Sequence, residues 1–225
     1  DRMTSSMLVI PTLNEVDGMK KVIPLIDKKW VDEILIVDGG STDGTLEEAK
    51  KLNLKTLSQK SKGFGGAIYD GFESTDAEYL LMFGADGNNE PEEIPKLLEK
   101  IKEGYDQVMI SRFGKTSIND DAGLIDTFGN RLFTSTTNIL FGGHFTDSLS
   151  SSRAFTRKAW NEIKLDSFGL DSVLQMSIRG LKKHHKILEI DGNERIRIGG
   201  ERKMHRISTG ISLSSRILNE IFWKG

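Results

Sequence analysis

The feature that most constrains the fold is a regular alternation of short apolar segments with longer amphipathic ones through the first half of the chain. The apolar segments have the length of buried strands, and the amphipathic ones repeat apolar residues at helical spacing. We expect strands at residues 6–10, 32–37, 54–57, 78–83 and 106–111, and helices at 15–28, 45–52, 63–74 and 92–102. Such alternation predicts an α/β fold: a doubly wound, mostly parallel sheet flanked by helices, Rossmann-like, whose ligands bind beyond the carboxyl ends of the strands.

The second half is less regular, but it contains no repeat, linker or low-complexity tract. We expect helices at residues 125–141, 170–179 and 207–223, and strands at 152–156 and 186–190. All 225 residues are therefore expected to form a single domain, which is within the usual length of one.

Composition and charge narrow the possible functions. The chain has no cysteine, which excludes disulfides, thiolate metal sites and cysteine nucleophiles and favours a reducing compartment. Its longest apolar runs are far shorter than the roughly 20 residues of a membrane span, and no charged-then-apolar leader opens it. Residues 1–110 carry 13 basic and 21 acidic side chains, whereas residues 111–225 carry 18 basic and 12 acidic ones. The basic second half indicates an anionic partner, and the scarcity of aromatic residues in its basic runs argues against single-stranded nucleic acid.

Polar clusters follow three of the expected strands, at residues 11–15, 38–44 and 84–89. Turns and helix caps explain any one cluster, and for Ser41, Thr42 and Asp43 alone we prefer that explanation. Three clusters at one sheet edge favour a binding site as well. There Asp38 can accept hydrogen bonds from a nucleobase or ribose, and Asp86 can bind a hard divalent cation. A sugar nucleotide needs both kinds of contact.

Other phosphate-binding motifs do not fit. Gly39 and Gly44 have the spacing of a Walker loop, but Thr45 stands where that motif requires lysine. Residues 62–66 lack the third glycine of the dinucleotide fingerprint, and residues 11–15 lack the glycines of sugar nucleotidyltransferases.

The polar clusters resemble the motifs of family 2 glycosyltransferases of the GT-A fold. Residues 11–15 (Pro-Thr-Leu-Asn-Glu) and 37–45 (Val-Asp-Gly-Gly-Ser-Thr-Asp-Gly-Thr) are similar to the opening of that family, and residues 62–71 to its next helix. Phe83-Gly84-Ala85-Asp86 takes the place of its Asp-x-Asp motif. Two positions depart from the pattern, because Gly39 replaces a common second aspartate and Gly84 replaces the first acid of Asp-x-Asp.

The second half resembles the dolichyl-phosphate mannose synthase branch of this family. The matching segments are residues 111–113 (Ser-Arg-Phe), 147–155, which has Ser150 in place of a glycine, and 197–203, which has Arg202 in place of a serine. The resemblance implies a metal-dependent, hexosyltransferase-like enzyme. Its nucleotide-binding half would be residues 6–110, and its acceptor-binding half residues 111–225 with the C-terminal helix.

The resemblance also implies the donor site of a nucleoside-diphosphate sugar. The residues that it places there are Pro11, Leu13, Glu15, Asp38, Gly40, Lys62, Ala85, Asp86, Arg197 and Lys203. Among them, Asp86 would bind Mg²⁺ or Mn²⁺ together with Asn88. Arg197 and Lys203 would close over the diphosphate.

For the acceptor, the resemblance implies a polyprenyl (dolichyl-type) phosphate bound by Arg131 and Arg112. Transfer proceeds with inversion, and a phosphate acceptor needs no general base. A sugar hydroxyl would need one, for which Asp171 is the nearest candidate; a surface or N-cap aspartate is an equal interpretation. The alternatives are a non-catalytic sugar-nucleotide-binding protein, a glycosyltransferase acting on a soluble or saccharide hydroxyl, and a nucleotidyltransferase on a related sheet.

The last helix bears on where the protein works. Its apolar residues either pack on the domain or lie in the headgroup plane of a membrane, with basic residues toward anionic lipid. We expect a cytoplasmic protein that makes a peripheral contact with the cytoplasmic face of a membrane and has no nucleic-acid partner.

Overall fold

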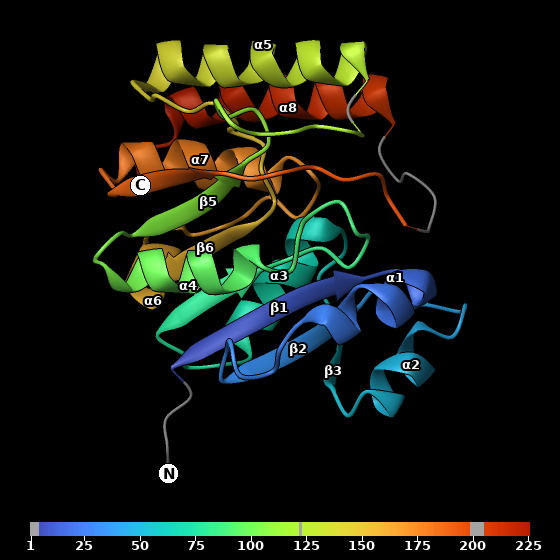
Figure 1. The fold of residues 1–225 in the computed structure, drawn as a ribbon. Helices are drawn as coiled ribbons and strands as arrows, with labels where there is room; N and C mark the ends of the chain where they lie inside the picture. The colour runs from blue at the N-terminus through green and yellow to red at the C-terminus, as the bar shows by residue number, and fades with distance from the viewer. Residues whose placement is uncertain (1–4, 122, 199–204) are drawn as a thin grey trace.

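A single seven-stranded sheet runs through both halves of the computed structural model, which describes residues 5–121, 123–198 and 205–225 (Figure 1). The strands are β1 (Ser6–Thr12), β2 (Glu33–Asp38), β3 (Lys55–Ser58), β4 (Tyr79–Met82), β5 (Gln107–Ser111), β6 (Arg153–Thr156) and β7 (Ile187–Asp191). The helices are α1 (Val16–Lys21), α2 (Thr45–Lys51), α3 (Phe64–Glu73), α4 (Glu93–Lys102), α5 (Leu124–Phe141), α6 (Arg157–Ile163), α7 (Ser172–Lys182) and α8 (Arg206–Phe222), with a 3₁₀ turn η1 (Ile23–Leu25).

The sheet has the order β3-β2-β1-β4-β6-β5-β7. All neighbouring strands are parallel except β6, which is antiparallel to both β4 and β5. The predicted fold class is therefore confirmed. Because β6, from the second half, lies between β4 and β5 of the first half and pairs with both, the two halves share one sheet.

Three local details differ from the sequence predictions. β1 continues through Pro11 to Thr12, because β4 ends at Met82 and its last pair with β1 is at Val9, so no strand on that side needs the missing N–H of Pro11. The helix expected at residues 15–28 is divided into α1 and η1, with Pro24 in η1. The unpredicted α6 follows β6 directly, and the hydroxyl of Thr156 caps it by accepting the Ala159 N–H at 3.1 Å.

Both faces of the sheet are covered. One apolar core contains side chains from α1 and α4, such as Met19 and Leu97, and the other contains side chains from α3, α6 and α7, such as Phe72, Trp160 and Met176. Parallel strands buried on both faces explain the continuous apolar runs in the sequence.

α5 and α8 lie side by side as an outer layer above α7 (Figure 1). α8 buries Leu213 and Ile217 against α7, and its Glu220 forms a buried ion pair with Arg179 at 3.0 Å. Trp223 lies against the same guanidinium, 4.3 Å from ring centroid to Arg179 Cζ. One face of α8 thus packs on the domain. No helix in the described parts of the chain is long and apolar enough to cross a bilayer.

Candidate active site

The loops that follow β1 and β2 are tied together by hydrogen bonds from side chains to backbone amides. Asn14, with a φ of +55°, accepts the N–H of Thr42 at 2.9 Å, and its own N–H donates to the Ser41 hydroxyl at 2.8 Å. Asp43 accepts the N–H of Val16 at 3.1 Å. These polar side chains have the structural role that we preferred for Ser41 and Asp43. Both bond the neighbouring loop, and Asp43 Oδ1 also accepts the N–H of Thr45, the first residue of α2, at 3.0 Å.

Asp38, the last residue of β2, is 4% exposed, and its carboxylate accepts four hydrogen bonds. The donors are the hydroxyls of Thr12 (3.0 Å) and Ser41 (2.5 Å) and the N–H groups of Gly40 (2.9 Å) and Ser41 (2.8 Å). Burial raises the pKa of Asp38, but these hydrogen bonds outweigh burial and hold the pKa below its usual range. A carboxylate has about four lone-pair positions. Asp38 therefore shapes its own turn in this structure, and its direct contact with a nucleoside remains a prediction.

Lys62 is exposed in the loop between β3 and α3, beside the turn at Asp38. The two loops are joined by the N–H of Gln59, which donates to the Asp38 carbonyl at 2.9 Å. Gly63, at a φ of +90°, lies so close to the segment before α7 that a Cβ would be 2.2 Å from the Phe168 carbonyl oxygen. The loop that carries Lys62 therefore connects the carboxyl edge of the sheet to residues 166–171.

Asp86, Glu15 and Arg197 meet at the same edge, as the resemblance implied. Asp86 lies in the loop after β4 with 22% of its side chain exposed, and its Oδ2 is 2.8 Å from the Arg197 guanidinium. The same guanidinium is 3.9 Å from Glu15 Oε1. Asp86 Oδ1 accepts the N–H of Asn88 at 3.1 Å. Residues far apart in the sequence thus form one charged cluster.

Arg197 is held there by residues 193–198, which we call the strap. The N–H of Arg195 donates to the Asn88 carbonyl at 2.7 Å, and the N–H of Ile198 donates to the Asp86 carbonyl at 2.8 Å. The Ile198 side chain covers Gly87, where a Cβ would be only 2.7 Å from it. The strap therefore lies directly on the loop that carries Asp86.

The residues expected at a metal form a sparse donor set. The Asn88 amide nitrogen donates to Asp121 at 3.1 Å and to the Arg195 carbonyl at 2.8 Å, which leaves its carbonyl oxygen for a metal. Gly84 offers no second acid, although a Cβ there would lie 3.3 Å from Asp86 Oδ1. Within residues 5–121, 123–198 and 205–225, no three His, Cys, Asp or Glu side chains are grouped to hold a metal. This set fits Mg²⁺ or Mn²⁺ where a diphosphate supplies further oxygens.

Glu93, in the first turn of α4, is a buried carboxyl group that no motif of the sequence indicated. It is 2% exposed and accepts the N–H of the strap residue Asn193 at 3.3 Å. Burial, with a contribution from the nearby charge of Glu90, raises the pKa of Glu93 to about 7. Glu90 itself pairs with Arg195 at 2.7 Å. Two carboxylates, those of Glu90 and Glu93, therefore bind the strap to the segment that follows β4.

Arg112, expected at the acceptor, is engaged within the protein. Its guanidinium binds Asp147 at 2.7 and 3.0 Å and Glu194 at 3.2 Å. Burial lowers the pKa of Arg112, but the two carboxylates outweigh burial and raise it. Asp147, which is fully buried, also accepts from Asn130 of α5 at 2.9 Å. Arg112 thus joins β5, the strap and α5, and nothing in this geometry supports a contact with an acceptor.

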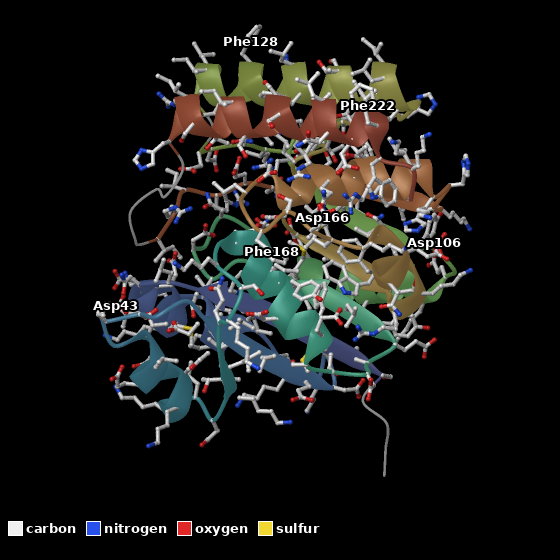
Figure 2. The ribbon with its side chains drawn as sticks, turned by 180° about the vertical axis from the view of Figure 1, so that it is seen from behind. Asp43, Asp106, Phe128, Asp166, Phe168 and Phe222 are labelled. Carbon is white, nitrogen blue, oxygen red and sulfur yellow. The ribbon has the colours of Figure 1, made fainter. Side chains whose placement is uncertain are left out.

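Arg131 lies on the exposed side of α5, and we find no ion pair for it among the residues that the structure describes. The same helix and the adjacent α8 carry a set of large apolar side chains that are 45–91% exposed. We call this set the outer face: Leu124, Ile125, Phe128, Leu132, Ile139 and Leu140 of α5, and Ile207, Leu218, Ile221 and Phe222 of α8. Figure 2 shows Phe128 pointing away from the molecule on this layer.

Asp171 lies immediately before α7 and is 7% exposed. Its Oδ2 accepts from the Ser167 hydroxyl at 2.7 Å and from Arg216 Nε at 2.9 Å. It occupies the N-cap position but makes no capping hydrogen bond, so capping does not explain it. The contact with Arg216 could not be predicted, because 45 residues separate the two.

The remaining predicted donor residues occupy the same edge or fall outside the described residues. Pro11 pairs with Val37 in the sheet, and Leu13 is 39% exposed in the next loop. Ala85 is 2% exposed. Gly40, at a φ of +99°, has open space where a side chain would project. Lys203 lies outside the described residues. The other residues end or follow the parallel strands β1, β2 and β4, so they share one edge of the sheet with Asp43, which follows β2. Figure 2 shows Asp43 and Asp106, which precedes β5, on opposite sides of the molecule.

A mixed sheet with polar loops converging at its carboxyl edge defines a nucleotide-binding α/β protein of the GT-A type. The family profile described as glycosyl transferase family 2 matches residues 7–164, and the chain belongs to this family. A relative named glycosyltransferase AglJ, from Haloferax volcanii, is 33% identical over 180 residues, which are 78% of this chain and 59% of the relative. The dolichol-phosphate mannosyltransferase of Pyrococcus furiosus is 28% identical over 213 residues, which are 88% of this chain and 58% of that protein. The chain thus spans little more than half the length of these relatives.

Solved structures show the same fold. Glucosyl-3-phosphoglycerate synthase from Mycobacterium tuberculosis, in complex with Mn²⁺, uridine diphosphate and phosphoglyceric acid, superposes with a TM-score of 0.77. The alignment covers 99% of this chain and 80% of that chain at 18% sequence identity. The same enzyme has also been solved with Mg²⁺ and uridine diphosphate.

Proposed function

We propose that this chain transfers a sugar, with inversion, from a nucleoside-diphosphate sugar to a polyprenyl phosphate at the cytoplasmic face of a membrane. The observation that carries the proposal is the outer face together with Arg131, an exposed cation on the same helix as Leu124 and Phe128. Soluble monomers rarely expose contiguous apolar surface on this scale. A lipid with an anionic headgroup matches both features.

In this proposal, residues 6–110 bind the donor. Pro11, Leu13, Glu15, Asp38, Gly40, Lys62 and Ala85 surround the nucleoside and the sugar, at the edge where the structure gathers them. A divalent cation held by Asp86 and Asn88 would stabilise the charge that develops on the leaving diphosphate. Arg197, 2.8 Å from Asp86, supplies positive charge at the same place. The solved structures with Mn²⁺ or Mg²⁺ and uridine diphosphate support this arrangement.

Residues 111–225 bind the acceptor. Arg131 contacts the acceptor phosphate, which is already an anion and needs no general base. The lipid chain lies along the outer face. Relatives named dolichol-phosphate mannosyltransferase and dolichyl-phosphate hexose transferase, at 28% and 27% identity, support this acceptor class.

A second candidate is transfer to a saccharide hydroxyl, with Asp171 as the general base. The observation that favours it is the geometry of Asp171, whose Oδ2 is fixed by Arg216 and Ser167. A base oriented by a neighbouring group is typical of catalytic carboxylates.

Sedimentation with vesicles of anionic phospholipid tests the membrane contact. We expect the protein to sediment with them at low salt and to be released at high salt, because surface charge is screened. Phe128→Ser, in the outer face, should weaken sedimentation, whereas Leu25→Ser, at a side chain 60% exposed in η1, should not. No sedimentation even at low ionic strength would contradict the membrane contact.

A transfer assay distinguishes a lipid-phosphate acceptor from a saccharide acceptor. The donors are a panel of uridine- and guanosine-diphosphate sugars, and the acceptors are a short polyprenyl phosphate and a neutral oligosaccharide. The proposal expects transfer to the phosphate. Transfer to the neutral acceptor alone would favour the second candidate. Binding of uridine or guanosine diphosphate without any transfer would favour a non-catalytic binding protein.

A further inference from the structure

A groove of about 450 Å³ lies between residues 166–171 and α8, outside the residues matched by the family profile. One wall carries Asp166, Phe168 and Asp171, and the other carries serine hydroxyls of α8 and the guanidinium of Arg216. Figure 2 shows Asp166 and Phe168 between α3 and the layer formed by α5 and α8. The volume is in the range of small-molecule sites.

The charges in the groove do not suit an anion. The Arg216 guanidinium is 2.9 Å from Asp171, 3.6 Å from Asp166 and 3.5 Å from Glu220. Arg179 pairs with two of the same carboxylates, Asp166 at 2.8 Å and Glu220 at 3.0 Å. Three carboxylates therefore face two guanidinium groups that they already engage, and a further anion would add to a net negative charge. The occupant that fits is neutral and offers hydroxyl groups to carboxylate oxygens.

Several polar atoms in the groove are available to such an occupant. Asp171 lines the groove, and within the described chain its Oδ1 accepts no hydrogen bond, whereas its Oδ2 accepts two. Asp166 has 60% of its side chain exposed. Ser212 and Ser215 also line the groove, and their hydroxyls have no protein partner in the parts of the chain that the structure describes.

The groove also has an aromatic side. Phe168 is held in place by Tyr69, with ring centroids 5.4 Å apart. An aromatic ring beside carboxylates and hydroxyls matches a sugar ring, whose C–H groups form an apolar face and whose O–H groups form a polar rim. The Phe168 carbonyl oxygen also accepts the N–H of Gly66 at 3.2 Å, which places the groove next to the loop of Lys62.

We propose that this groove binds a neutral sugar ring, with α8 supplying the hydroxyl-bearing wall. The inference deepens the proposed function, on which it rests for a sugar substrate, and it makes α8 part of a binding site. The sugar is either that of the donor or a sugar unit of an acceptor, because both offer the same chemistry.

Ligand-observed NMR and calorimetry on the full chain test the proposal. The probes are free glucose, mannose and N-acetylglucosamine, uridine and guanosine diphosphates, and their nucleotide sugars. Ser212→Leu fills the groove and Phe168→Leu removes the aromatic side. Ser214→Leu is the matched control, because Ser214 is exposed on α8, does not line the groove and donates to the Gly210 carbonyl. Thermal unfolding checks that each variant is folded.

We expect both groove variants to weaken sugar binding about tenfold, the change that 1.4 kcal/mol produces, and the control to bind like the parent. Weaker binding of nucleotide sugars at unchanged nucleoside-diphosphate affinity identifies the donor sugar. Weaker binding of free sugars alone identifies an acceptor sugar. The proposal is overturned if neither groove variant changes the binding of any sugar-containing probe, or if Ser214→Leu has an equal effect. Nucleoside diphosphates that fail to bind while sugars bind the groove would contradict the proposed function and leave this inference standing.

Discussion

The carboxyl edge of the sheet and the outer face of α5 and α8 present opposite kinds of surface. At the edge, carboxylates and hydroxyls are buried and bonded to one another, as in the four hydrogen bonds that Asp38 accepts. On the outer face, apolar side chains such as Leu124 (91% exposed) are left without cover. The difference teaches that the edge is organised by its own hydrogen bonds, whereas the outer face has apolar side chains that no described part of the chain covers.

The largest effect should come from breaking the ion pair that docks the outer layer. Glu220→Ala should lower the free energy of unfolding by about 3 kcal/mol, because it removes the buried carboxylate of Arg179 and leaves the guanidinium paired with Asp166, whose side chain is 60% exposed. Urea unfolding measures this change, and Asn219→Ala, at an exposed neighbour on α8, should change stability by less than about 0.5 kcal/mol. A loss under about 1 kcal/mol would mean that apolar contacts alone hold α8.

The next effect concerns the edge. Asp86→Asn should lower the rate of sugar transfer by about 100-fold or more and remove the Mn²⁺ dependence of nucleotide binding, because it deletes the carboxylate proposed at the metal. Asp76→Asn, at an exposed carboxylate in the loop before β4, is the control. Parental transfer with unchanged Mn²⁺ dependence in Asp86→Asn would show that the metal assignment is wrong.

Gly84→Asp tests the same metal site by adding a carboxylate instead of removing one. A Cβ at residue 84 lies 3.3 Å from Asp86 Oδ1, so the variant places a second carboxylate beside the first. We expect about tenfold tighter Mn²⁺-dependent nucleotide binding, measured by calorimetry. Weaker binding with Mn²⁺ than in the parent would contradict the site.

A further prediction concerns the pH dependence of stability that Glu93, next to the strap, produces. Burial raises the pKa of Glu93 to about 7 in the folded protein, against its ordinary value of 4.5, so the folded state holds this proton more tightly than the unfolded one. The resulting stabilisation is complete below about pH 4.5 and is lost as the pH rises through 7. Glu93→Gln should therefore gain up to about 3 kcal/mol over the parent at pH 8 and little at pH 4.5. Glu92→Gln, at an exposed neighbour, should show no such pH dependence in urea unfolding.

An effect of the same size as that of Gly84→Asp concerns Arg131, an exposed cation on α5. Arg131→Ala should raise the KM for a polyprenyl phosphate about tenfold and leave the donor KM unchanged, because only the acceptor phosphate contacts the guanidinium. Steady-state kinetics with each substrate varied in turn measure both constants. Equal effects on the two constants, or full activity of the parent on an uncharged acceptor, would count against a lipid phosphate.

Much of the fold and of the donor edge could be predicted because the information is local. Buried strands appear as apolar runs, and parallel strands bring their carboxyl ends to one edge, so residues 11–15, 38–44 and 84–89 had to converge. The position of Arg197 beside Asp86 was predicted from the resemblance, not from spacing. The antiparallel direction of β6 was missed, because a four-residue strand carries no signal for its direction. The seven-residue α6, which follows β6 directly, was missed as well.

By itself, the sequence determined most of the strands and helices along the chain, the polar edge of the sheet and the membership of the family. Periodicity and short motifs act within a few residues, so these features can be predicted locally. Only the tertiary structure decided which charged side chains are paired within the protein and which remain exposed. Arg112 and Arg131 look alike in the sequence, yet one is enclosed by Asp147 and Glu194 and the other stands among apolar side chains. The orientation of the Asp171 carboxylate is likewise set by an ion pair with Arg216, a residue of α8. The physical reason is that Coulomb interactions and burial depend on distance in space, which the chain sets only when α5, α7 and α8 pack together.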